Sequence, residues 1–146
     1  GCHTGTTIIP NPKLRSIYDR EHAAFGKTPN RFGMIMTEAA YSGGQEWLNQ
    51  LMHYLEKNKT LFTTAMKSQN KLQVFDLEST YLAWVDFSQL DITEFELKNM
   101  FIKEAGVAPS FGRGFGKNSG KFARFNIACR TEILDLAINR LTKTFL

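Results

Sequence analysis

Apolar and polar positions along the first half of the chain repeat at the spacing of helices. Three helices are predicted there, over residues 13–25, 30–40 and 45–66. Apolar side chains recur at every third or fourth position of each, and Gly26, Pro29 and the Gly43-Gly44 pair separate the segments. The middle segment is apolar on nearly every side, so we expect it to be buried between layers.

The pattern changes in the second half of the chain. Runs rich in aromatic and β-branched residues predict strands over 72–77 and 80–87, and the latter is central because both of its faces are apolar. Residues 122–129 alternate and predict a third strand. The order helix, helix, long helix, strand, strand, helix, strand, helix favours an α+β fold, with an antiparallel sheet of about three strands covered by helices on one face.

Local signals mark the ends of the two helices in this half. Thr93 and Glu96 have the spacing of a capping box, in which a hydroxyl and a carboxylate satisfy the first backbone amides of a helix. Gly106 suits the left-handed position that ends that helix. Thr131 is expected to cap the final helix.

The stretch 111–129 holds a glycine-rich loop that leads into the third strand. The loop follows a helix and precedes a strand, which is the reverse of the order in phosphate-binding loops. Arg113-Gly114-Phe115-Gly116 matches the start of an RNA-recognition signature, but Lys117-Asn118 breaks the match. The third interpretation is a loop that closes over a ligand.

Arg124 lies in the middle of the third predicted strand, on the face that carries Phe122, while Ala123 and Phe125 lie on the opposite face. A guanidinium among apolar neighbours is costly unless an anion meets its donors. A bound carboxylate or phosphate is one explanation. A partner Asp or Glu of the protein, or a side chain that reaches water, is the other.

Composition narrows the class of protein. The chain has 146 residues, 42% of them hydrophobic, 22% charged, and a net charge of +4. Its basic residues form no block, which disfavours nucleic acid as a partner, and no apolar run is long enough for a membrane span. Cys2 and Cys129 make no disulfide framework, so the cytoplasm is expected. Three histidines lack ligand spacing, and no metal site is expected.

Five short motifs, in order over almost the full length, resemble one enzyme family. They are Ile8-Ile9-Pro10-Asn11-Pro12, Glu38-Ala39-Ala40-Tyr41 with Trp47-Leu48, residues 80–86, Ala105-Gly106-Val107 with Phe115-Gly116, and residues 122–129. Together they resemble the C-terminal portion of pyridoxal 5′-phosphate (PLP) enzymes of the aspartate-aminotransferase fold, in particular the cystathionine β-lyase or C–S lyase branch. The family usually has proline where Phe111 stands.

The resemblance implies a domain organisation and a set of site residues. Residues 1–44 would be the tail of the large PLP-binding domain and the crossing to residues 45–146, the small C-terminal domain. Arg124 matches the arginine that binds the α-carboxylate of the amino-acid substrate, and His3 and Thr4 fall where the cofactor phosphate is contacted. The lysine that forms the Schiff base would lie upstream, so no catalytic residue is expected in this chain.

The implied activity is β-elimination from a cystathionine-like or cysteine-like substrate by the parent protein, a homodimer, with the 146 residues inactive alone. A true aminotransferase, the effector domain of a transcription regulator, and a remnant of a truncated gene that survives as a binding module stay open. If its partner segments are absent, the apolar segment 32–40 is expected to be partly uncovered.

Overall fold

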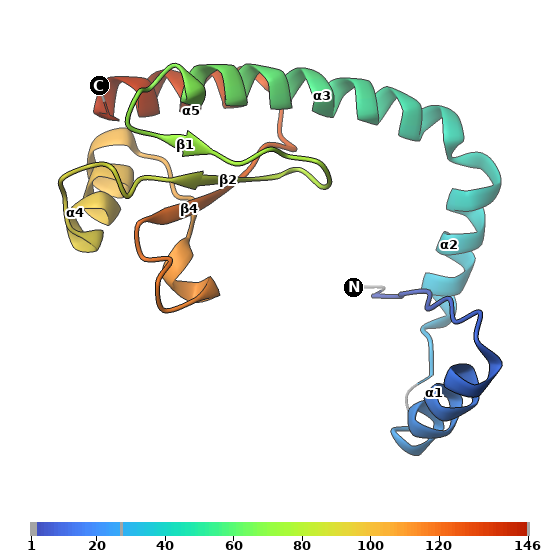
Figure 1. The fold of residues 1–146 in the computed structure, drawn as a ribbon. Helices are drawn as coiled ribbons and strands as arrows, with labels where there is room; N and C mark the ends of the chain where they lie inside the picture. The colour runs from blue at the N-terminus through green and yellow to red at the C-terminus, as the bar shows by residue number, and fades with distance from the viewer. Residues whose placement is uncertain (1–2, 27, 146) are drawn as a thin grey trace. The chain divides into compact units, whose positions relative to one another are not determined.

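The computed structural model describes residues 3–26 and 28–145, so Gly1, Cys2, Lys27 and Leu146 lie outside the described residues (Figure 1). Contacts between Cα atoms divide the chain into two compact units, which meet between Gln50 and Leu51. This boundary falls within the long helix α3 (Gln45–Lys67). The expected division into domains at residue 44 stays a prediction.

The first unit holds α1 (Pro12–Ala24), α2 (Arg31–Gly43) and the start of α3. Side-chain caps begin α1 and α2. The side-chain amide oxygens of Asn11 and Asn30 accept backbone N–H groups of the first turn. The break between α2 and α3 is confirmed at Gly44. A Cβ atom there would lie 2.5 Å from the carbonyl oxygen of Ala40, so only glycine fits without a shift.

The expected burial of the second helix is not found within the first unit. Gly33 is the buried residue of α2, whereas Phe32 is 70% exposed and Met36 is 60% exposed. The sequence pattern shows that a helix has apolar sides, but burial also requires a second surface to pack on those sides. No described element of the unit covers them.

The second unit is built on a four-stranded antiparallel sheet in the order β1-β2-β4-β3. Its strands are β1 (Gln73–Val74), β2 (Leu82–Asp86), β3 (Ser110–Phe111) and β4 (Phe122–Asn126). The α+β class is confirmed. The first two strands are shorter than expected, and β3 adds an edge strand that is too short to show an alternating pattern. Arg124 pairs in register with Trp84 on one side and with Ser110 on the other.

Helices pack on one face of this sheet, which we call the covered face. It carries Ala83, Val85, Ala123 and Phe125, each at most 6% exposed. Figure 1 shows α3 and α5 (Thr131–Phe145) together on one side of the sheet. Buried residues of α3, α4 (Glu94–Asn99), the π-helix η1 (Met100–Ala105) and α5 complete one hydrophobic cluster with the covered face.

The predicted ends of α4 and η1 are confirmed. Thr93 and Glu96 form the capping box, in which each side chain accepts the backbone N–H of the other residue. Gly106, with φ of 62° and ψ of 35°, ends η1 in the left-handed conformation.

Thr131 does not cap α5 with its own side chain, which corrects the sequence-based expectation. Its backbone N–H donates instead to the hydroxyl of Tyr54 at 2.7 Å, and its hydroxyl donates to Asn58 Oδ1 at 2.9 Å. Asn58 is fully buried and also donates to the carbonyl oxygens of Ile127 and Cys129. A side chain of α3 therefore accepts the first backbone N–H of α5, a role that a local cap was expected to fill.

Candidate anion-binding site

The sheet face opposite the covered face carries Trp84, Phe122 and Arg124, and we call it the outer face. All three side chains are half-buried. Trp84 and Phe122 are stacked with ring centroids 5.6 Å apart, and Phe75 lies 6.4 Å from Phe122. The alternation predicted for the third strand is confirmed, because Ala123 and Phe125 are buried on the other side. Arg124 is thus a cation set among aromatic rings.

The guanidinium of Arg124 has no carboxylate partner among the described residues. Its Cζ lies 4.6 Å from the ring centroid of Phe115, and Nη2 is 3.5 Å from Ser110 Oγ, a long contact for a hydrogen bond. Its Nε is buried and has no acceptor within the described part of the chain. A buried donor without an acceptor costs free energy, which a bound anion could offset.

The glycine-rich loop is packed against the start of β4 at Phe122. Its first part forms a short 3-10 helix, η2 (Gly112–Phe115). A Cβ atom on Gly112 would lie 2.0 Å from the carbonyl oxygen of Ser119, and one on Gly120 would lie 2.3 Å from a carboxylate oxygen of Glu94. Glycine is required at Gly112, where a backbone oxygen occupies the space of a side chain, whereas a side chain at Gly120 would displace the carboxylate end of Glu94.

An ion pair joins this loop to α4. Arg113 Nε donates to both carboxylate oxygens of Glu94, at 3.1 and 3.0 Å, and Nη2 pairs with the same carboxylate. Nη1 donates to the carbonyl oxygen of Lys117 at 2.8 Å. These bonds to Arg113 lower the pKa of Glu94 and raise the pKa of the guanidinium. This pair could not be predicted from sequence spacing, since the two residues are 19 positions apart.

His3 and Thr4 lie in the first unit and line an exposed hollow there. Thr7, Tyr18 and His22 line it as well; the Thr7 and Tyr18 hydroxyl oxygens are 3.3 Å apart, and the Tyr18 and His22 rings are stacked. Hydroxyl and imidazole groups can donate to phosphate oxygens. No lysine is found among the described residues that line the hollow. His3 and Thr4 thus line one hollow of the first unit, and Arg124 belongs to the second unit.

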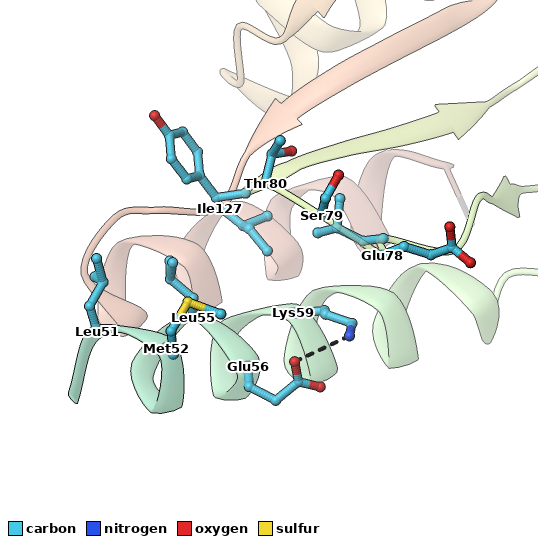
Figure 2. A pocket seen from close by; sticks show the side chains of 11 residues that line it. Leu51, Met52, Leu55, Glu56, Lys59, Glu78, Ser79, Thr80 and Ile127 are labelled. Carbon is cyan, nitrogen blue, oxygen red and sulfur yellow. Dashed lines mark hydrogen bonds and ion pairs between the residues drawn. The ribbon is translucent and has the colours of Figure 1, made fainter. Parts of the chain in front are cut away.

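A groove in the second unit contains none of the predicted site residues. It lies between α3 and the connection from β1 to β2, and Figure 2 shows Met52 and Leu55 on the helix below Ile127. Glu56 and Lys59 form an ion pair of 3.1 Å along its helical wall. Lys59 therefore already has an anionic partner, which makes this groove a weaker anion site than Arg124.

The described residues hold neither a metal-binding cluster nor a helix that could cross a membrane. No three His, Cys, Asp or Glu side chains in residues 3–26 and 28–145 cluster in a way that could hold a metal ion. None of the described helices combines the length and the hydropathy that crossing a membrane requires.

The chain is similar to proteins of known structure and function. It is 30% identical over 143 residues to "Cystathionine beta-lyase PatB" of Bacillus subtilis, an alignment that covers 97% of this chain and 37% of that protein. A PLP-bound putative aminotransferase from Clostridium difficile is 30% identical with a TM-score of 0.82, over 95% of this chain and 36% of that one. A PLP-bound C–S lyase from Staphylococcus hominis is 28% identical with a TM-score of 0.75, over 94% and 36%.

The chain spans little more than a third of the length of these proteins and aligns to their C-terminal part. No protein-family model matches it.

Proposed function

Because the chain is homologous to the C-terminal part of cystathionine β-lyases and C–S lyases of the aminotransferase fold, we propose that it forms that part of a PLP-dependent enzyme. The reaction proposed is β-elimination from a cystathionine-like or cysteine-like amino acid. The 37% share of the Bacillus relative supports the view that further residues complete the active site, and the 146 residues by themselves should be inactive.

The arrangement around Arg124 carries this proposal. An α-amino acid presents a flat carboxylate, which two N–H groups of a guanidinium can bind in parallel. Arg124 offers such donors on the outer face, with Nε buried and no carboxylate partner among the described residues. We therefore assign Arg124 to the α-carboxylate of the substrate, where it fixes the orientation of the bonds at Cα.

The proposed reaction balances with water as the second reactant. Bound PLP supplies an electron sink for the charge that develops at Cα. The Cα–H and Cβ–S bonds break, the sulfur leaves as a thiol, and water hydrolyses the remaining enamine to a 2-oxo acid and ammonia. Arg124 binds and orients the substrate and exchanges no proton with it, because a guanidinium stays charged at any working pH.

His3 and Thr4 are proposed to contact the phosphate of PLP. Their imidazole and hydroxyl groups fit a phosphate chemically, whereas the lysine that must bind the aldehyde of PLP is not found among the described residues of the hollow. We propose that this lysine is supplied from outside the present sequence. A cytoplasmic homodimer is proposed for the complete enzyme.

The decisive test uses Arg124→Lys in the full gene product, with PLP and cystathionine. A lysine keeps the charge but loses the planar pair of donors, so KM should rise about tenfold or more. Lys103→Arg, an exposed change on η1, is the matched control. An unchanged KM in Arg124→Lys would remove the assignment.

Two further measurements separate the alternatives. A lyase releases ammonia and a 2-oxo acid from cystathionine alone. An aminotransferase needs a 2-oxo acid as its second substrate, which accepts the amino group. The visible absorbance of PLP mixed with the 146-residue chain, beside that of the full gene product, tests where the anchoring lysine lies. A stoichiometric band with the short chain would mean that one of its own lysines is the anchor.

A further inference from the structure

Phe115 has a position on the outer face that the carboxylate assignment does not explain. Its ring covers the guanidinium of Arg124 at 4.6 Å, and Trp84 and the same ring form a T-shaped pair with centroids 5.4 Å apart and planes at 88°. Phe115 is 51% exposed, so burial of apolar area is an incomplete reason for its position. The ring lies where it can restrict the orientation of the guanidinium.

A guanidinium held over an aromatic ring by a cation–π contact can still present its coplanar N–H groups to a ligand at its edge. An arginine side chain loses considerable rotamer freedom when it is fixed, and this cost weakens ligand binding if the ligand must impose the order. A ring that has already ordered the side chain removes part of that cost. The contact therefore favours a planar anion that approaches the N–H edge of the guanidinium.

The loop that carries Phe115 is itself fixed. Arg113, two residues earlier, is bonded to the carboxylate of Glu94 and to the carbonyl oxygen of Lys117. The Glu94 carboxylate lies over Gly120, where a Cβ atom would be 2.3 Å from its oxygen. An ion pair between α4 and η2 thus restrains the loop that carries Phe115.

We propose that Phe115 is a positioning residue for Arg124, held in place by the Glu94–Arg113 ion pair. This proposal rests on the proposed function, because it concerns the arginine assigned to the substrate carboxylate. Phe115 orders the guanidinium before the carboxylate arrives, and Glu94 and Arg113 act through Phe115.

The first experiment measures the order of Arg124 directly in the 146-residue chain. The heteronuclear NOE of the Arg124 Nε–H should fall in Phe115→Leu, which keeps apolar volume but removes the ring, and should be restored in Phe115→Tyr. Phe95→Leu is the matched control, because Phe95 is 72% exposed on α4. An unchanged NOE in Phe115→Leu overturns the positioning role whether or not a carboxylate binds.

The second experiment titrates the same signal with sodium acetate at constant ionic strength. The apparent Kd should rise about three- to tenfold in Phe115→Leu, as expected for loss of a partly desolvated cation–π contact. The Kd should stay within about twofold of the parent value in Phe115→Tyr and Phe95→Leu. In Glu94→Gln the rise in Kd should lie between that of Phe95→Leu and that of Phe115→Leu.

Arg124→Lys separates the two proposals. If the Arg124 signal does not respond to acetate, or if Arg124→Lys binds acetate as tightly as the parent chain by isothermal titration calorimetry, the carboxylate assignment fails. If Arg124→Lys loses acetate while Phe115→Leu retains the parent Kd, the carboxylate site stands and the positioning role fails. In the full gene product, loss of positioning should raise KM and leave kcat unchanged.

Discussion

The two faces of the sheet use similar side chains for different purposes. Phe125 and Phe122 lie three residues apart on β4, yet Phe125 is 6% exposed in the helix-covered core while Phe122 is half-buried beside Trp84 and Phe75. On the covered face Phe125 contacts the rings of Phe62 and Phe101. On the outer face the same kind of ring borders a cation without a carboxylate partner among the described residues.

The comparison shows that residue type alone does not identify a functional face. Aromatic residues are common on both sides of β4, so the number of phenylalanines does not distinguish the core from the outer face. The difference is the partner of each ring. Rings on the covered face contact other core rings, as Phe125 contacts Phe62 and Phe101, whereas Phe115 on the outer face contacts Arg124.

The largest expected effect is the loss of a ring from the covered face. Phe125→Ala should lower the free energy of unfolding by about 3–5 kcal/mol, because it leaves a cavity in the core. Phe122→Ala, on the same strand but the outer face, should cost about 1–2 kcal/mol. Urea unfolding followed by far-UV circular dichroism measures both. Equal losses would mean that the two faces do not differ in their contribution to stability.

Asn58 tests the polar connection between α3 and the end of β4. Asn58→Ala should cost about 2–4 kcal/mol, because the carbonyl oxygens of Ile127 and Cys129 lose their donor in a buried place. Thr131→Val removes the hydroxyl that donates to Asn58, and should cost about 1 kcal/mol. The same unfolding measurement compares them. A loss in Asn58→Ala no greater than that in Thr131→Val would contradict the importance of the two carbonyl bonds.

Two glycines of the same loop should respond differently to alanine. Gly112→Ala places a Cβ atom 2.0 Å from a backbone oxygen and should cost about 1–3 kcal/mol, with a change in the Trp84 fluorescence as the loop moves. Gly114→Ala has no atom within 4 Å of its Cβ and should be close to neutral. Thermal unfolding and the emission spectrum, in a Trp47→Phe background, report on both. Similar behaviour of the two variants would mean that the loop is not closely packed.

The smallest expected effect concerns acid. The folded-state pKa of Glu94 is below its ordinary 4.5, because Arg113 hydrogen-bonds its carboxylate, with smaller charge effects from Arg113 and Lys98. The pair therefore stabilises the fold above pH 4.5, and this contribution is lost as the pH falls through the lowered folded-state value.

Glu94→Gln should reduce the stability difference between neutral and acid pH, whereas Glu104→Gln, an exposed change on η1, should leave it as in the parent chain. Glu96 keeps part of the acid sensitivity in either variant, because hydrogen bonds from the backbone and side chain of Thr93 also lower its pKa. Unfolding curves at pH 3, 4, 5 and 7 would show this. An identical pH dependence in Glu94→Gln and the parent chain would contradict a stabilising pair.

Local signals explain most of what could be predicted. Helix breaks at Gly44, the capping box at Thr93 and the left-handed Gly106 depend on neighbours within a few residues, and all three are confirmed. The alternation along β4 placed Arg124 on the face away from the core. The resemblance to C–S lyases is confirmed by the relatives, while the roles of Arg124, His3 and Thr4 stay predictions.

Features that depend on distant residues could not be predicted. The edge strand β3 exists because Ser110 and Phe111 pair with β4, and two residues are too few to show a period. The Arg113–Glu94 pair joins positions 19 apart, and the Asn58–Thr131 bond joins positions 73 apart. Thr131 resembled a local cap by its type and place, but a tyrosine hydroxyl of α3 satisfies its backbone amide.

The sequence by itself determined the class of fold, the order of its elements, the side of the strand that carries Arg124 and the family that the chain resembles. These follow from periodicity and local backbone chemistry, which act over a few residues. Only the tertiary structure decided which groups surround the guanidinium, because Phe115 reaches it through loop packing and Ser110 reaches it through strand pairing. The absence of a carboxylate partner among the described residues is likewise a property of the assembled sheet, and it makes Arg124 a candidate for binding an anion.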